Sequence, residues 1–132
     1  MLVYPHDKDA GRRHDLAAHL VAELWETRQA VISTQILQEF HVNATRKMKT
    51  PISRPVAREI VETYAAWQTE IIGPGDIPMA SELEERHQLS FWDALIVVAA
   101  LEGGATTILT EDMSPGRVVS AIRLENPFAS PR

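Results

Sequence analysis

The chain contains one almost wholly apolar run, Ser-Phe-Trp-Asp-Ala-Leu-Ile-Val-Val-Ala-Ala-Leu at residues 90–101, with Gly103 and Gly104 just beyond it. Ser90 is a favoured helix N-cap and Gly103 a favoured helix stop, so the run predicts a helix of about three turns. A helix that is apolar on nearly every face belongs in a protein interior. We therefore expect the core to form around it, with its one carboxylate, Asp93, in the first turn.

A second short segment, Thr-Thr-Ile-Leu-Thr at residues 106–110, predicts a buried strand because it is β-branched and too short for a helix. Glu111 and Asp112 follow its end. Asp93 could serve only as a helix cap, and Asp112 could simply open a turn. Open parallel sheets, however, present their ligand sites at the carboxyl ends of the strands, which favours a functional role for both residues.

Length and composition indicate an ordinary globular protein. The 132 residues suit a single domain over residues 1–132, and the 45% apolar and 23% charged fractions are typical of such domains. No apolar run approaches the roughly 20 residues that span a bilayer, and the start of the chain does not resemble a signal peptide. We therefore expect a cytoplasmic protein with no membrane partner. The absence of cysteine excludes disulfides and thiolate zinc sites, and the net charge of −5 argues against a surface that coats nucleic acid.

Strand and helix signals alternate along the whole chain. Predicted strands cover residues 1–4, 30–32, 70–72, 106–110 and 121–124, and predicted helices cover residues 9–25, 35–42, 54–68 and 77–88 in addition to the central one, with a short helical or turn segment at 118–119. Alternation of this kind implies an α/β fold, a three-layer α/β/α sandwich with a mostly parallel sheet joined by right-handed crossovers.

The acidic residues at the ends of these elements are the functional clue. Glu39, Asp93 and Asp112 come from three separate strand and helix regions. Carboxylates that converge without basic partners repel one another, so such a cluster usually binds a divalent cation, and hard oxygen ligands select Mg²⁺ or Mn²⁺.

Basic residues cluster after the Glu39 helix. Arg46, Lys47 and Lys49, with Arg54 and Arg58 further on, could bind a phosphate backbone while the acidic residues hold the metal. A solvated helix end is the alternative for this cluster.

Three segments resemble the motifs of PIN domains, the fold of VapC-type toxin ribonucleases. They are Ile-Ser-Thr-Gln-Ile-Leu-Gln-Glu-Phe at 32–40, Leu-Ser-Phe-Trp-Asp-Ala-Leu-Ile at 89–96 and Leu-Thr-Glu-Asp-Met at 109–113. The resemblance implies a nuclease that hydrolyses RNA with Mg²⁺ or Mn²⁺ held by the catalytic residues Glu39, Asp93 and Asp112, supported by Thr110 or Glu111. It further implies a toxin that pairs with a small antitoxin protein and forms a homodimer.

The chain departs from the PIN pattern at its start. PIN domains open on a strand that ends in Asp-Thr-Asn or Asp-Ser-Asn, and residues 1–4 match only the part that follows. We expect this sequence to be N-terminally truncated relative to the family and impaired as it stands, and we do not expect Asp7 or Asp9 to replace the missing ligand. The alternative is a non-catalytic PIN-like module that binds an antitoxin or nucleic acid, and a phosphate-binding receiver-like domain is a weaker possibility.

Overall fold

The structure, a computed structural model, describes residues 2–111, 113 and 116–128. Helices and strands are interspersed along the chain, but they do not alternate strictly, because the last three elements are all strands. The order is η1 (Tyr4–His6), η2 (Lys8–Ala10), α1 (Arg12–Thr27), β1 (Val31–Ser33), α2 (Thr34–Val42), η3 (Asn43–Lys47), α3 (Arg54–Tyr64), β2 (Gln68–Glu70), α4 (Asp76–His87), α5 (Phe91–Glu102), β3 (Thr107–Leu109), β4 (Val118–Val119) and β5 (Ile122–Glu125).

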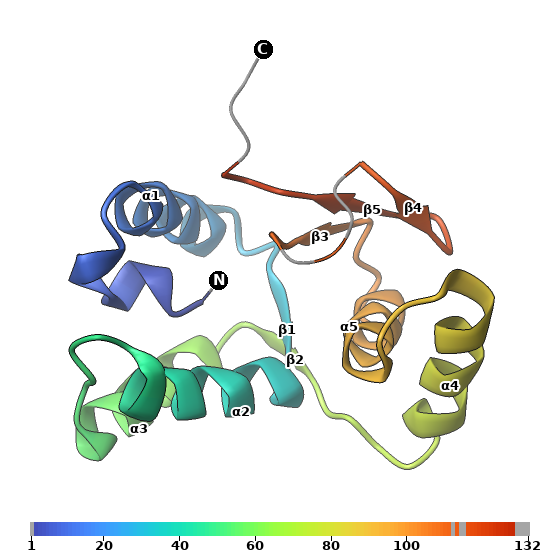
Figure 1. The fold of residues 1–132 in the computed structure, drawn as a ribbon, viewed down its shortest axis with the longest axis horizontal. Helices are drawn as coiled ribbons and strands as arrows, with labels where there is room; N and C mark the ends of the chain where they lie inside the picture. Colours follow the sequence, from blue (N-terminus) through green and yellow to red (C-terminus); the bar gives the residue numbers. More distant parts are fainter. Residues whose placement is uncertain (1, 112, 114–115, 129–132) are drawn as a thin grey trace.

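The elements are arranged in layers. Figure 1 shows α1, α2 and α3 on one side of the strands β1 and β2, with α4 and α5 on the other side. Helix α4 packs along α5, and α5 also contacts β1 and β3. The predicted α/β sandwich is therefore confirmed, and α5 is the helix that links its parts.

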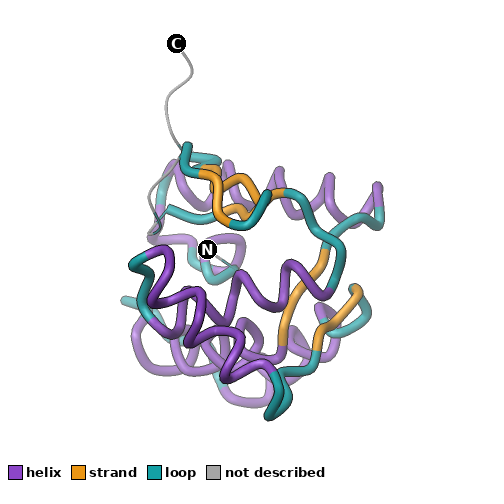
Figure 2. The backbone as a smooth tube through the Cα atoms, turned by 90° about the vertical axis from the view of Figure 1, so that its right-hand side faces the viewer, coloured by secondary structure: helices purple, strands orange, loops and turns teal. Residues whose placement is uncertain are grey.

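The strands are divided between two small sheets. Strand β1 pairs with β2 in parallel, with Ile32 opposite Thr69. Strand β5 pairs with β3 in parallel and with β4 in the antiparallel sense. Figure 2 shows the strands gathered in two separate places along the backbone. The predicted mostly parallel pairing is correct, but no hydrogen bonds join β1 to β3 in the described part of the chain.

The apolar run at residues 90–101 forms the centre of the larger core, as expected. Ala94, Val97 and Val98 are completely buried, and they pack with Ile122 and Leu124 of β5. A smaller core holds Ile32, Leu37 and Tyr64, against which Trp25 and Trp67 pack. Burial of the apolar side chains in these two cores is the main source of stability in a chain of this size.

The end of α5 approaches β1 closely, which requires Gly103. A Cβ atom at Gly103 would lie 2.6 Å from Cγ1 of Val31 and 3.3 Å from the carbonyl oxygen of Ala99. We predict that Gly103→Ala lowers the free energy of unfolding by about 1–3 kcal/mol, because an overpacked contact forces neighbours to shift. Urea unfolding would measure this, with Gly73→Ala as the control, since a Cβ at Gly73 meets nothing within 4 Å. Equal stabilities for the two variants would contradict this packing.

The start of the chain differs from the prediction. Residues 1–4 were expected to form the end of a strand, but Leu2 and Val3 lie in a turn and Tyr4 begins the 3₁₀ helix η1, while residue 1 lies outside the described residues. Pro5 explains the difference, because its ring fixes φ in the helical range and it has no N–H to donate to a neighbouring strand.

Three other boundaries shift for identifiable reasons. Strand β2 begins at Gln68 instead of residue 70, because its register places Thr69 opposite Ile32 and leaves Ile71 78% exposed. Helix α3 consequently ends at Tyr64. The segment Val118–Val119, expected to be helical or a turn, is a strand because Val119 pairs with Ile122.

His6 joins the N-terminal segment to the smaller core. Its Nε2 lies 2.8 Å from the hydroxyl of Tyr64, and its ring packs edge-on against Phe40. Burial, and then the nearby His14, lower the pKa of His6, while burial raises the pKa of Tyr64 to about 12. The folded state therefore favours the neutral imidazole.

Stability should consequently fall on acidification. Because the pKa of His6 is lower in the folded state than its ordinary value of 6.5, the unfolded chain takes up the proton first as the pH drops below 6.5. The stabilising effect is present above that pH and is lost as the pH falls through the folded pKa. We predict that His6→Gln flattens the decline in unfolding midpoint between pH 7.5 and pH 5, whereas His19→Gln, at an exposed site, does not. Identical pH profiles for the three proteins would contradict this role.

No helix in the described residues is long and apolar enough to cross a bilayer.

Candidate functional site

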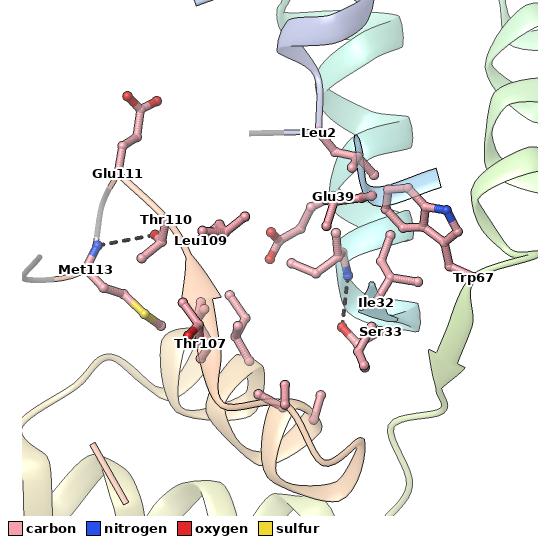
Figure 3. Close-up of a pocket in the computed structure, with 18 residues that line it drawn as sticks. Leu2, Ile32, Ser33, Glu39, Trp67, Thr107, Leu109, Thr110, Glu111 and Met113 are labelled. Carbon is pink, nitrogen blue, oxygen red and sulfur yellow. Dashed lines mark hydrogen bonds between the residues drawn. The ribbon is translucent and has the colours of Figure 1, made fainter. Parts of the chain in front are cut away.

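An apolar cavity of about 270 Å³ lies between the two sheets. Val31, Ile32 and Ser33 of β1 line it on one side, and Thr107, Ile108 and Leu109 of β3 line it on the other. The carboxyl ends of β1 and β3 therefore reach the same space, and Figure 3 shows this region with its lining residues. In the sheet folds that the sequence predicts, this is where a ligand site is expected.

Glu39 lies on α2, the helix that begins directly after β1. The Ser33 side chain caps this helix by accepting a hydrogen bond from the Ile36 amide at 3.3 Å. Glu39 then falls in the second turn, where its side chain is exposed and lines the cavity. Figure 3 shows its carboxylate pointing toward Leu109 and Thr110 at the end of β3. Glu39 thus lies about one turn into the helix that follows β1, which is where the sequence places it, and its side chain is open to solvent.

Asp93 lies in the first turn of α5 and is partly exposed. The helix is capped by Ser90, whose hydroxyl oxygen accepts a hydrogen bond from the Asp93 backbone amide at 3.1 Å. The Asp93 carboxylate itself has no hydrogen bond or ion pair among the described residues. The cap therefore depends on the hydroxyl of Ser90 and on a backbone amide, which leaves the side chain of Asp93 available for another role.

Gln35 connects the two helices that carry these carboxylates. Its amide nitrogen donates to the Oε1 atom of Glu39 at 3.0 Å and to the carbonyl oxygen of Trp92 at 3.1 Å. Both partners are acceptors, so only the NH₂ group of the amide can face them. Gln35 is 6% exposed, and its buried Oε1 atom has no hydrogen-bond partner among the described residues. An unpaired buried acceptor costs about 1–3 kcal/mol, so this arrangement is not one that stability alone would favour.

Asp112, the third predicted ligand, lies outside the described residues. Its neighbour Glu111 faces away from Glu39, as Figure 3 shows. Glu111 accepts hydrogen bonds from the hydroxyl of Tyr4 and from Nε of Arg13, the latter at 3.0 Å. Burial alone would raise the pKa of Glu111, but these two bonds and the positive charge of Arg13 outweigh it and lower the pKa below its ordinary value. The carboxylate of Glu111 is therefore paired with the N-terminal part of the chain.

Asp7 and Asp9 have structural partners away from the cavity. The Asp7 carboxylate caps η2 by accepting from the Asp9 amide at 3.1 Å, and the Asp9 carboxylate accepts from the Thr50 hydroxyl at 2.8 Å. Neither residue lines the cavity between β1 and β3. Their positions agree with the expectation that they do not replace a strand-end ligand.

The predicted substrate-binding residues lie at the far end of α2. Arg46 and Lys47 belong to the π-helical turn η3, Lys49 follows it, and all three are exposed. Lys47 lines a second hollow, of about 470 Å³, together with Glu39. A positive side chain and the candidate metal ligand thus border the same surface depression, which runs along α2.

The side-chain chemistry of Glu39 and Asp93 shows whether these residues suit a metal ion. Glu39 and Asp93 supply the hard oxygen donors that Mg²⁺ and Mn²⁺ prefer, and Gln35 ties Glu39 to the residue next to Asp93. Within the described residues no three acidic or histidine side chains converge closely enough to hold a metal ion. The donor types therefore fit a divalent cation, and a complete set of protein ligands requires residues beyond Glu39 and Asp93.

The layered helices, the parallel strand pairs and the acidic residues near the strand ends define an α/β protein with a candidate site at the ends of its strands. The PIN domain family profile matches residues 7–118, so this chain belongs to the PIN domain family. The matched region contains Glu39 and Asp93, as well as the position of Asp112. No curated protein matches the chain at a significant level.

Two features of the site were not predicted from the sequence. The Gln35 bridge had a detectable signal, because Gln35 and Glu39 are four residues apart on one helix, a spacing at which side chains meet. The pairing of Tyr4 and Arg13 with Glu111 had no detectable sequence signal, because about 100 residues separate the partners and no local pattern indicates their contact.

Proposed function

We propose that this protein is a metal-dependent endoribonuclease of the VapC toxin type, which hydrolyses RNA phosphodiester bonds in the cytoplasm with Mg²⁺ or Mn²⁺. The observation that carries the proposal is the link from α2 to α5, in which Gln35 contacts both the carboxylate of Glu39 and the carbonyl of Trp92 beside Asp93. Membership of the PIN family, a nuclease-type fold, supports the proposal.

Each group has a role in this proposal. Glu39 and Asp93, with Asp112, would hold the cation through their oxygens. A divalent cation in that position supplies Lewis-acid activation of the scissile phosphate and of the attacking water. The exposed Arg46, Lys47 and Lys49 bind the phosphate backbone, and Lys47 lies on the same hollow as Glu39, so the backbone would approach along α2.

The cavity between β1 and β3 supports the expectation of a further strand. Both strands turn an edge toward this cavity without pairing with each other, and Leu2 also lines it. A short apolar strand preceding Met1 would find hydrogen-bonding edges on both sides and would end near Glu39. We propose that the Asp-bearing strand of the family occupies this space and supplies a further metal ligand.

Ribonuclease activity tests the proposal directly. A form extended by the upstream Asp-bearing residues should cleave a single-stranded or structured RNA in the presence of Mn²⁺ and should stop when EDTA is in excess. Glu39→Gln in the same form is the matched control for a contaminating nuclease. Cleavage that survives EDTA, or that Glu39→Gln leaves unchanged, would refute a metal-dependent mechanism at this site.

We also propose that the protein forms a homodimer and binds a small antitoxin protein. The exposed apolar side chains that such an association could bury include Ile71, Trp92, Val118 and Ile77, which have the largest exposed fractions among the described residues. Trp25 and Trp67 do not belong to this exposed set, because their ring centroids lie 5.0 Å apart and both rings pack against Tyr64. Light scattering that shows a monomer at high concentration would contradict the dimer.

A non-catalytic PIN-like module that binds an antitoxin or nucleic acid is the second candidate. The described residues contain no group of three acidic or histidine side chains that could hold a metal ion, and Asp112 lies outside them. The two proposals differ in one result, because a binding module would retain RNA or antitoxin affinity in the extended form without cleaving RNA.

A further inference from the structure

Gln35 is the most unusual polar residue of the candidate site. It is 6% exposed, and its amide nitrogen is hydrogen-bonded to two groups that belong to different helices. Its other polar atom, Oε1, is buried without a hydrogen-bond partner among the described residues. A glutamine retained only for packing would not need to leave a buried acceptor unpaired, so the residue is better explained by what its amide nitrogen holds in place.

The two hydrogen bonds fix the relation between the candidate metal ligands. The bond to Oε1 of Glu39 restricts an otherwise exposed and flexible carboxylate to one orientation. The bond to the carbonyl of Trp92 connects the same amide to the first turn of α5, one residue before Asp93. A single side chain thus couples the direction of Glu39 to the position of the helix that carries Asp93.

We propose that Gln35 is a positioning residue that orients Glu39 relative to Asp93 for metal binding. The inference rests on the proposed function of the same site. A carboxylate that is held by a neighbour binds a metal more tightly than a free one, because less conformational freedom is lost on binding.

The first test asks whether the metal depends on Gln35. Gln35→Met keeps the length of the side chain and removes its amide, so Mn²⁺ affinity measured by calorimetry should fall by about 10–100-fold, the usual effect of removing a partner of a metal ligand. Gln29→Met makes the same chemical change at an exposed position before β1 and should leave the affinity unchanged. Unchanged affinity in a folded Gln35→Met protein would overturn the inference.

The second test does not depend on metal or on activity. In the unaltered chain the side-chain NH₂ resonances of Gln35 should be shifted and slowed in exchange relative to those of Gln29, because both protons have fixed acceptors. Glu39→Ala changes an exposed residue and keeps Gln35, so it should move the Gln35 resonances without unfolding the protein. Resonances that do not move would show that the Gln35 and Glu39 side chains do not interact, and would overturn the inference even if Gln35→Met fails to fold.

The two tests also separate the inference from the proposed function. If even the extended form binds no Mn²⁺ while the Gln35 resonances respond to Glu39→Ala, the interaction exists but the metal site does not, which refutes both the proposed function and the ordering role of Gln35. If Mn²⁺ binds and only Gln35→Met has no effect, the proposed function stands and the inference alone fails.

Discussion

Asp93→Asn should abolish RNA cleavage in the extended form while leaving the protein folded. The substitution keeps the shape of the side chain and removes the charge that binds a cation. Since changing even the residues that orient a metal ligand costs about 10–100-fold, losing a charged ligand should lower the cleavage rate by more than about 100-fold. The thermal midpoint should change little, because the cap at this helix start uses the hydroxyl of Ser90 and the backbone amide of Asp93.

Ser90→Ala is the matched control for this prediction. It removes the hydroxyl that accepts from the Asp93 amide, so it should lower the free energy of unfolding by about 1 kcal/mol while most of the activity remains. If Asp93→Asn loses activity but not stability, and Ser90→Ala loses stability but not activity, the Asp93 side chain belongs to the metal site. If Asp93→Asn instead lowers the midpoint and spares cleavage, Asp93 acts only at the helix end.

Extension of the chain at its N-terminus should produce the other large effect. About five to eight upstream residues, the length of an ordinary strand, should add a strand between β1 and β3 and deliver the Asp of an Asp-Thr-Asn or Asp-Ser-Asn triplet to the end of the sheet. We expect Mn²⁺ affinity to rise by more than about tenfold, RNA cleavage to rise with it, and the unfolding midpoint to increase. The 132-residue chain should be folded but nearly inactive.

A variant of the extended form separates the two contributions of the added residues. Changing the Asp of the added triplet to Asn keeps the strand, so the gain in stability should remain while the gain in Mn²⁺ affinity is lost. Equal Mn²⁺ affinity in the extended and 132-residue chains would mean that the existing carboxylates suffice. The account of a missing strand-end ligand would then be wrong.

Local signals were sufficient to predict the helices but not the ends of the strands. Helix α5 was predicted from the Ser90 cap and Gly103, and both bound it in the structure. The sequence did not predict why a glycine is needed at position 103. Gly103 allows the close approach of Val31, which is a contact between distant parts of the chain. Strand β2 was misplaced by two residues because its start depends on the register with β1, which no local pattern encodes.

The candidate site shows the same division between local and long-range information. The positions of Glu39 in the second turn of α2 and of Asp93 in the first turn of α5 followed from caps and helical spacing, which are local. The pairing of Tyr4 and Arg13 with Glu111 depends on how the N-terminal segment folds back onto the rest of the chain. Pro5 makes this segment a 3₁₀ helix instead of the expected strand. Whether Asp112 joins the site stays a prediction, because it lies outside the described residues.

The most direct test of the account is a calorimetric Mn²⁺ titration of the extended form and of its Glu39→Gln, Asp93→Asn and Asp112→Asn variants. If the three carboxylates share one metal site, each single change should weaken Mn²⁺ binding strongly, and combining two changes should weaken it by less than the product of the single effects, because the site is already disrupted. Mn²⁺ binding that none of the three changes affects would show that these residues do not form a metal site, and the proposed nuclease mechanism would be contradicted.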